Sequence, residues 1–287
     1  MANFSLLASF VLVACFPVTT VAFLPRVFSG NGKSTTRDHA MITKEGFLKP
    51  LLYFFVENPQ YLKNDSLTDV LDHLLSIDVQ EAIQVTIDNI SPQIKFLNAL
   101  NEIQSANVEI DSFPFSTSAS AHFDGEQFEQ GATRLVQLRQ ELVTMLLQGG
   151  KLQHARNLAG EALHTLQDFY SHSNWIELGN PVPYDILGRP GSDIPKENIA
   201  SPNEATCKDC KPGECENNLI TTKLTSGYRS DQDIKKPENM GKCSHGGTGD
   251  KSRLKPATGG INKDASSTLD SPHARYDFDF YESKVLN

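Results

Sequence analysis

Residues 126–172 read EQFEQGATRLVQLRQELVTMLLQGGKLQHARNLAGEALHTLQDFYSH, and this stretch decides the fold class. Apolar side chains recur at helical spacing through its first half, at positions 135, 138, 142, 145 and 146. The pair Gly149-Gly150 is a good left-handed stop for that helix. A second helix is predicted over Lys151–His172.

The sequence before this stretch also predicts helices. They are, in chain order, Lys44–Val56, Leu67–Ile87 after the cap residue Ser66, and a helix that opens at Ser91-Pro92 and runs to about Ile103. No alternation typical of strands and no hairpin signal interrupts the series. We therefore expect an all-α fold, with a helical domain over residues 23–179.

The amino terminus predicts secretion. Met1–Ala22 has a short start, an apolar run and small residues that suit cleavage before Phe23, as in a signal peptide. The apolar core is too short for a comfortable membrane span, although a retained anchor is the alternative. Asn64 and Asn89 have the form of glycosylation acceptors in such a compartment.

Residues 180–265 have a different character, rich in Pro, Gly, Asn, Asp and Lys, with little apolar periodicity. They hold all four cysteines of the mature chain, which are Cys207, Cys210, Cys215 and Cys243. In an oxidising compartment these predict two disulfides with three possible pairings, and a zinc knuckle is the rival. We expect this irregular region to be held in shape by the disulfides. Loss of the bridges should loosen residues 200–245 and leave the helices folded, because few apolar residues tie the two together. Residues 266–287 form a short terminal segment.

The charge balance bears on the class of partner. The chain has 35 Asp and Glu residues against 26 Lys and Arg, a formal net charge of −9. No basic stripe is available to phosphates, which argues against nucleic-acid binding. Neither a Gly-rich phosphate loop nor a Gly-x-Ser-x-Gly elbow occurs, so a serine triad is not expected.

Histidines near carboxylates are the strongest chemical signal. His164, Asp168 and His172 follow at i, i+4 and i+8 and share one helix face, as metal ligands would, or as a simple His–Asp hydrogen bond would. His39, His122 and the His273-x-x-x-Asp277 pair lie in distant parts of the chain. Together with the helical row they suggest a site for more than one zinc ion. Of the remaining histidines, His73 is interpreted as a helix-surface or packing residue and His154 as a supporting residue. His245 is either a loop residue or an extra ligand, and the loop is favoured.

Several phrases resemble a known family, the amino-terminal domain of von Willebrand factor A domain-containing protein 7, which is similar to the fungal protein Het-C. They are His39-x-x-Ile42-Thr43, His122-Phe-Asp124, Ala162-Leu-His164-Thr-Leu-Gln-Asp168-Phe-Tyr-Ser-His172-Ser-Asn-Trp175-Ile-Glu177, Cys243-Ser-His245-Gly-Gly247, Gly259-Gly-Ile-Asn-Lys-Asp264 and Ser271-Pro-His273. More distantly, the histidine pattern resembles the zinc-dependent phospholipase C and S1/P1 nuclease superfamily, all-α enzymes with three zinc ions.

The distant resemblance implies roles for individual residues. His122, His164 and Asp168 would bind a first zinc, with Asp168 bridging to another; His273 and Asp277, joined by His172, would bind a second; His39 would bind the third. Asp111 or Glu109 is a candidate carboxylate by position only. The implied activity is hydrolysis of a phosphodiester or phospholipid. The alternatives are a non-catalytic extracellular module that binds protein partners and a disulfide-stabilised ligand without metal.

Overall fold

The computed structural model describes residues 39–40, 42–44, 46–47, 57–58, 90–180, 182–211, 215, 217–247 and 250–263. Several predictions fall outside these residues: the signal peptide, the helix over Leu67–Ile87, the acceptors Asn64 and Asn89, and the pair His273 and Asp277. Within the described part of the chain, no helix combines the length and the apolar character needed to span a membrane.

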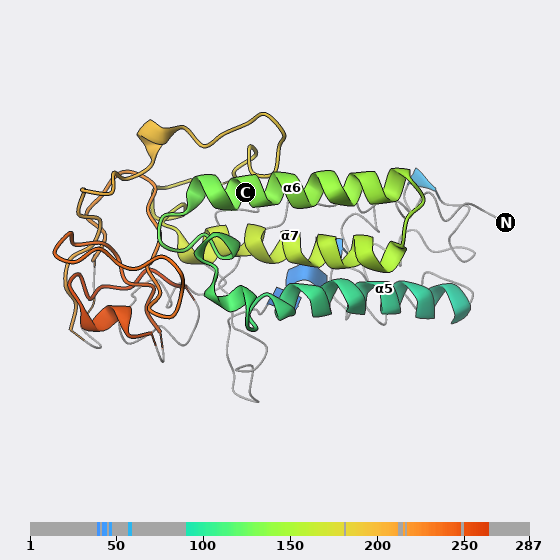
Figure 1. The fold of residues 1–287 in the computed structure, drawn as a ribbon, viewed down its shortest axis with the longest axis horizontal. Coiled ribbons are helices and arrows are strands. Elements are labelled where there is room, and N and C mark those ends of the chain that lie inside the picture. Colours follow the sequence, from blue (N-terminus) through green and yellow to red (C-terminus); the bar gives the residue numbers. More distant parts are fainter. Residues whose placement is uncertain are drawn as a thin grey trace.

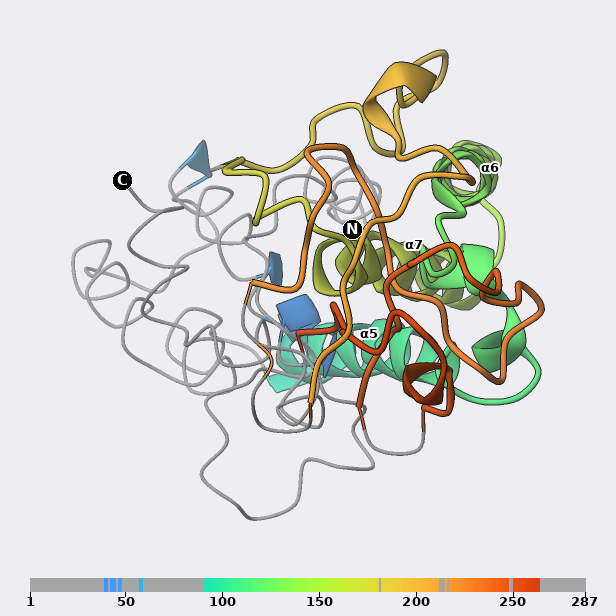
Figure 2. The same ribbon diagram turned by 90° about the vertical axis from the view of Figure 1, so that its left-hand side faces the viewer.

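Three long helices dominate the described residues: α5 (Ile90–Glu109), α6 (Phe128–Leu147) and α7 (Leu152–His172). Figure 1 shows α7 lying between α5 and α6, and the turned view in Figure 2 agrees. The described residues contain short 3-10 turns and isolated β-bridges but no sheet. The predicted all-α class is confirmed.

Helix α5 continues to Glu109 instead of ending near Ile103 as the sequence predicted. The extension follows from burial, because Ile103, Ala106 and Ile110 are all buried at helical spacing. The extra length matters for the site, since it places Asp111 directly after the helix. Residues 39–40 and 42–44 are also helical, ahead of the predicted start at Lys44.

The carboxyl-terminal half of α7 is buried on every side. All ten residues from Leu163 to His172 are buried, both the apolar residues and the polar ones. Leu166 and Phe169 belong to an apolar cluster with Phe123 and Phe128. The polar side chains of this half must therefore find their partners inside the protein, because water does not reach them.

At Gly160, helix α7 packs closely against α5. A Cβ at this position would lie 2.4 Å from the carbonyl oxygen of Ile103 and 2.8 Å from the Cβ of Ala106. Only glycine lets the two helices pack at this distance. His164 follows one turn later on α7, so this contact sets the spacing between α5 and the polar half of α7.

The irregular region packs against one end of the helices (Figures 1 and 2). Leu187, Ile194 and Leu224 join the apolar cluster of Phe128 and Leu166. For residues 200–245 the sequence predicts few apolar ties to the helices, and within that stretch Leu224 is the buried residue that joins this cluster. Single apolar residues spaced irregularly along the chain make these contacts, and periodicity cannot reveal them.

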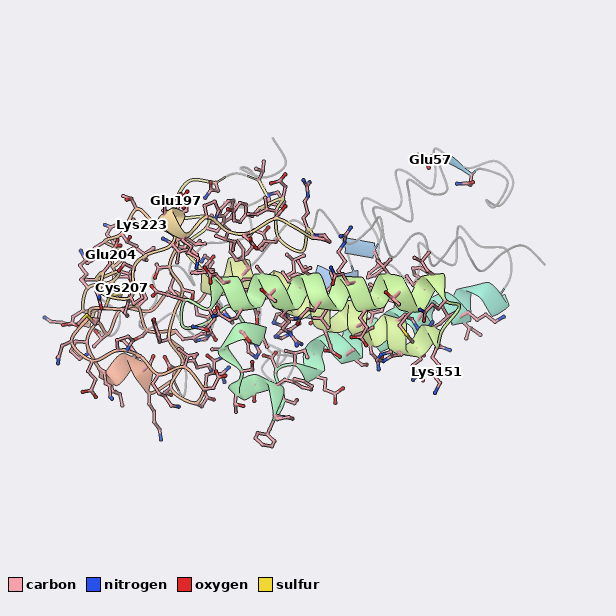
Figure 3. All side chains as sticks on the ribbon, turned by 45° about the horizontal axis from the view of Figure 1, so that its top comes forward. Glu57, Lys151, Glu197, Glu204, Cys207 and Lys223 are labelled. Atoms are coloured by element: carbon pink, nitrogen blue, oxygen red, sulfur yellow. A yellow bond between two sulfur atoms is a disulfide. The ribbon has the colours of Figure 1, made fainter. Side chains whose placement is uncertain are left out.

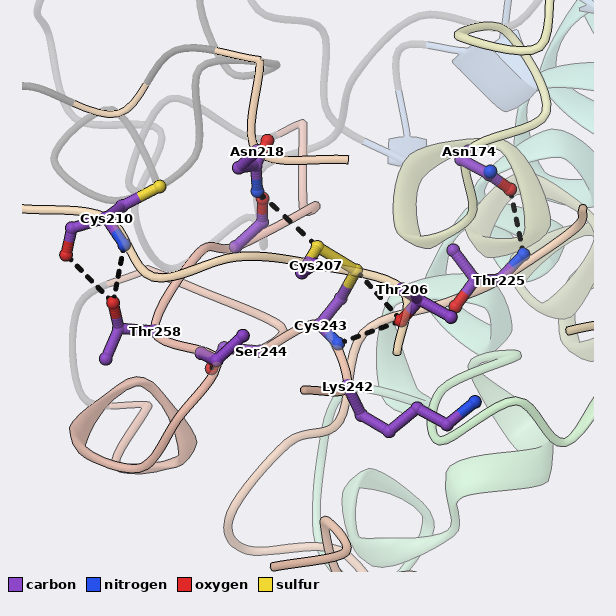
Figure 4. Close-up of a disulfide and its surroundings, with 12 residues drawn as sticks. Asn174, Thr206, Cys207, Cys210, Asn218, Thr225, Lys242, Cys243, Ser244 and Thr258 are labelled. Atoms are coloured by element: carbon purple, nitrogen blue, oxygen red, sulfur yellow. Dashed lines mark hydrogen bonds between the residues drawn. A yellow bond between two sulfur atoms is a disulfide. The ribbon is translucent and has the colours of Figure 1, made fainter. Parts of the chain in front are cut away.

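Two disulfides pair the four cysteines as Cys207–Cys243 and Cys210–Cys215, so they are not metal ligands. Figure 4 shows the Cys207–Cys243 bridge, where the backbone N–H of Cys243 donates to the hydroxyl of Thr206 at 3.2 Å. In Figure 3, Cys207 and Lys151 lie at opposite ends of the molecule. The bridge thus strengthens the irregular end, far from the α6–α7 turn.

Buried lysines join the irregular region to the helical part. The Lys242 ammonium is fully buried, 2.8 Å from the Glu126 carboxylate, and donates to the carbonyl of Ser201 at 2.7 Å. The Lys263 ammonium donates to the carbonyl of Ser173, just after α7, at 2.5 Å. Burying an ammonium is costly unless it is paired, so these contacts hold the two parts in one arrangement.

Candidate metal centre

Asp168 lies at the centre of a buried group of histidines. Helix α7 places His164 one turn before it, with His164 Nε2 3.0 Å from Asp168 Oδ2. His122, which comes from the loop before α6, brings its Nδ1 to 2.7 Å from the same oxygen. The two imidazoles are themselves in contact, with His164 Nε2 3.1 Å from His122 Nδ1. The predicted ligands His122, His164 and Asp168 therefore meet in one place.

The loop that carries His122 is built from unusual backbone. Phe123 and Glu126 have φ values of 53° and 58°, in the left-handed region that non-glycine residues rarely adopt, and Gly125 lies between them with φ 59°. These conformations turn Phe123 into the apolar cluster while His122 and Asp124 face α7. Strain of about 1–3 kcal/mol per residue is typical of backbone that positions functional side chains.

His39 approaches Asp168 from the other side. Its Nδ1 donates to the side-chain oxygen of Gln167 at 2.8 Å, which leaves Nε2 3.3 Å from Asp168 Oδ1. The ring stacks on that of His164, with 4.1 Å between centroids. Both His39 and His172 are buried.

Asp111 completes the group on its most exposed side. Its Oδ1 lies 3.8 Å from His164 Nε2 and its Oδ2 4.0 Å from His39 Nε2, and its side chain is 19% exposed. Glu109, the other candidate carboxylate, is exposed on α5 and lines a polar groove between α5 and α7. The structure therefore brings Asp111 to the histidines and leaves Glu109 out.

The spacing of these atoms suits a shared metal ion. Zinc binds imidazole nitrogen and carboxylate oxygen at about 2.0–2.2 Å in tetrahedral geometry, which separates neighbouring ligand atoms by about 3.3–3.5 Å. The contacts of His39 and His164 with Asp168 are 3.3 and 3.0 Å. Two sets of ligand atoms lie within 4.8 Å of one another: His39, His164 and Asp168, and Asp111, His122 and His164.

Hydrogen bonding within the group does not explain every contact. Because His39 Nδ1 donates to Gln167, a neutral His39 presents the lone pair of Nε2 to an oxygen of Asp168. Two acceptors in contact at a buried site need a cation between them. In addition, Asp168 Oδ1 is buried without a hydrogen-bond partner among the described residues. The residues fit a metal ion.

The charges of the group favour metal ligation at Asp168. Burial would raise the pKa of Asp168, but His164, His172 and His39 hold it well below its usual value, so the carboxylate is ionised. Burial and His164 lower the pKa of His39 more than Asp168 and Asp111 raise it. Burial would also lower the pKa of His164, but Asp168 and Asp111 raise it above its usual value.

A second buried group joins the predicted ligand His172 to Asp124 and His245, two residues that the sequence did not commit to as ligands. Asp124, His172 and His245 offer ligand atoms within 4.8 Å of one another. His172 was a predicted ligand, Asp124 was quoted within the His122 phrase, and His245 was interpreted as a loop residue with an extra ligand as the alternative. Burial would lower the pKa of His172, but Asp124 and Asp168 raise it to about 10.

Comparison with known proteins agrees with the resemblance seen in the sequence. The family model described as the VWA7 N-terminal domain matches residues 77–282. The chain is 37% identical to mouse von Willebrand factor A domain-containing protein 7 over 277 residues, which are 93% of this chain and 29% of the relative. It is 38% identical to the human protein of that name over 259 residues, 88% of this chain and 28% of the relative.

The chain thus spans less than a third of the length of these curated relatives. No solved structure matches it. The family model covers most of the chain, including the loop of His122 and all of α7. The chain belongs to the VWA7 N-terminal domain family.

Proposed function

We propose that this chain is a secreted zinc protein whose metal centre is built around Asp168. His122, His164 and Asp111 would hold one ion with Asp168 Oδ2, and His39 would hold another with Asp168 Oδ1. The observation that carries the proposal is that the two oxygens of one buried, ionised carboxylate contact different histidines: Oδ1 contacts His39, and Oδ2 contacts His122 and His164. A bridging carboxylate in a two-metal site has this arrangement.

The side chains around the centre support the proposed ligation. Gln167 accepts the Nδ1 proton of His39 and is itself held by Asn107, whose amide donates to the same oxygen at 3.1 Å. Such contacts fix the tautomer of a ligating histidine and the orientation of its ring. The Gln167 amide in turn donates to the hydroxyl of Thr43 at 3.2 Å. The ring of His39 is therefore positioned before any metal binds.

The reaction that we propose for this centre is hydrolysis of a phosphodiester or phospholipid. Zinc, when bound, supplies Lewis acidity toward a phosphoryl oxygen and lowers the pKa of water. Asp111 is the most exposed member of the group, so substrate would approach from its side. The disulfides suit an oxidising, extracellular compartment, which supports the proposed secretion.

Purified protein from the medium of animal cells tests this proposal. Its hydrolysis of bis(p-nitrophenyl) phosphate and of phosphatidylcholine vesicles would be measured before chelation, after chelation, and after zinc is restored. We expect activity that chelation abolishes and zinc restores. Asp168→Asn should lose it, while His154→Asn, an exposed histidine on the same helix, should keep it.

The possible outcomes separate the parts of the proposal. Zinc-loaded wild-type protein that hydrolyses neither substrate would contradict the activity and leave a non-catalytic extracellular module. Activity that persists in Asp168→Asn would contradict the role of the metal centre itself. Retention of the protein inside the cells with residue Met1 intact would contradict the proposed secretion.

A further inference from the structure

We propose a separate metal-binding site formed by Asp124, His172 and His245, which takes a divalent transition ion of the zinc type. The three side chains come from the His122 loop, the end of α7 and the segment after Cys243. Asp124 is fully buried, and His172 and His245 are 8% and 6% exposed. This site goes beyond the centre at Asp168 because it needs Asp124 and His245, which that centre does not use.

The hydrogen bonds of His245 leave its Nε2 available as a ligand. Its Nδ1 is 2.8 Å from the carbonyl oxygen of Gly246, which can only accept, so Nδ1 carries the proton. Nε2 then presents a lone pair and lies 4.0 Å from Asp124 Oδ1. A histidine whose far nitrogen donates to a backbone carbonyl has the arrangement typical of metal ligands.

The two carboxylate oxygens of Asp124 also have different partners. Its Oδ2 accepts a hydrogen bond from the amide of Gln232 at 2.7 Å. Its Oδ1 faces His172 Nδ1 at 3.2 Å and His245 Nε2 at 4.0 Å. His245 Nε2 is buried without a hydrogen-bond partner among the described residues. Two buried acceptors that face each other call for a cation between them.

His172 is the third proposed ligand, but a protonated His172 would also explain the group without a metal ion. Its ring lies 4.5 Å from that of His245. Its Nδ1 is 3.0 Å from the carbonyl oxygen of His122, which can only accept, so Nδ1 carries the proton and a neutral His172 binds metal through Nε2. Without a metal, a protonated His172 between Asp124 and Asp168 would balance the charge as a buried ion pair. That pairing leaves the lone pair of His245 unexplained, whereas a metal ion uses all three side chains.

The fold fixes the position of His245 firmly. Its N–H donates to the carbonyl of Tyr228 at 2.8 Å, and its own carbonyl accepts from Ile261 and Asn262. Gly227 permits this approach, because a Cβ there would lie 2.6 Å from the Cα of His245. The N–H of Gly227 donates to the carbonyl of His172 at 3.2 Å, which links the segment to the end of α7.

The disulfide supports the same segment. Cys243, two residues before His245, is bonded to Cys207. The site is thus assembled from distant parts of the chain and positioned by backbone hydrogen bonds and a covalent bridge. Two imidazole nitrogens and one carboxylate oxygen suit zinc, and three protein ligands leave a coordination position for water or a small anion.

Metal stoichiometry of the full secreted chain tests the proposal. Protein stripped with dipicolinate would be reloaded with Zn²⁺, dialysed, and analysed by inductively coupled plasma mass spectrometry. We expect His245→Asn and Asp124→Asn each to lose one ion per chain relative to wild type. His154→Asn, the matched control on an exposed histidine, should lose none. Circular dichroism and thermal denaturation would establish that each variant is folded.

The metal content of the His164→Asn variant distinguishes the further site from the metal centre at Asp168. If His164→Asn loses metal while folded His245→Asn keeps the wild-type number, the further site is refuted and the centre at Asp168 stands. If His164→Asn keeps one ion that the double variant with His245→Asn loses, the further site stands alone.

If Asp124→Asn or His245→Asn fails to fold, anomalous diffraction from wild-type crystals at the zinc edge tests whether an ion lies between these two residues. A peak between Asp124 and His245 in wild-type crystals is the expected result. Density at Asp168 without such a peak would overturn the proposal, and wild-type protein that holds no metal would overturn both sites.

Discussion

Replacing Gly160 by alanine tests the close packing of α5 on α7, which sets the distance between Asp111 and His164. The added Cβ would lie 2.4 Å from the carbonyl oxygen of Ile103 and 2.8 Å from the Cβ of Ala106. Both distances are far inside van der Waals contact, and the first partner is helix backbone. Because packed interiors leave no room to absorb such an overlap, the helices must move apart.

Two opposing effects set the size of the change. Alanine is better than glycine in a helix interior by about 0.8–1.0 kcal/mol. Overpacking a core costs about 1–3 kcal/mol, and the upper part of that range applies where backbone must yield. We therefore expect Gly160→Ala to lower the free energy of unfolding by about 1–2 kcal/mol. At about 2–4 °C per kcal/mol for a domain of 150–250 residues, the change in Tm is measurable.

Urea denaturation followed by circular dichroism, with metal content measured on the same samples, is the assay. Gly160→Ala should also retain less zinc, because Asp111 moves away from His164. Asn157→Ala is the control, an exposed change on the same helix that gains propensity without a clash. Gly160→Ala protein as stable as wild type, with its zinc intact, would refute the close packing and its link to the site.

Three further predictions concern the remaining buried groups. The cysteines Cys207 and Cys243 should resist thiol reagents until a reductant is added, and free thiols in the native protein would contradict the pairing. In metal-free protein, the pKa of His172 is about 10 in the folded state against 6.5 in the unfolded state. Protonated His172 therefore stabilises the fold fully below pH 6.5, and this contribution is lost as the pH rises through about 10. The urea midpoint of wild type should therefore fall over that range more than that of His172→Gln, and equal slopes would contradict the ion-pair geometry. Glu126→Gln leaves the Lys242 ammonium buried without its carboxylate and should cost about 3–5 kcal/mol in urea denaturation, a loss that an exposed pair would not show.

Sequence patterns predicted the helical framework and the pairing of His164 with Asp168 because both depend on local spacing. The i, i+4 row places His164 and Asp168 together on any helix, and the apolar repeat predicts where α6 and α7 lie. The meeting of His122 with this row could not be derived from spacing alone. It depends on the left-handed backbone at Phe123, which has no signature in the sequence.

The second group shows where sequence reasoning fails. His245 lies in a segment without apolar periodicity, and its burial depends on backbone contacts with Tyr228 and Ile261. The nearby Cys243 was the available signal, since a residue beside a disulfide is held in place. The packing of residues 180–265 on the helices was missed for the same reason, because scattered residues such as Leu187 and Leu224 form the contact.

The zinc content of purified wild-type protein and of Asp168→Asn tests the central claim most directly. Protein secreted from cells in zinc-containing medium would be purified without chelators and analysed by inductively coupled plasma mass spectrometry. The buried, ionised carboxylate shared by His39, His122 and His164 predicts more than one zinc ion per wild-type chain and loss of most of it in Asp168→Asn. Folded wild-type protein without zinc, or an Asp168→Asn variant that keeps all of it, would contradict the account.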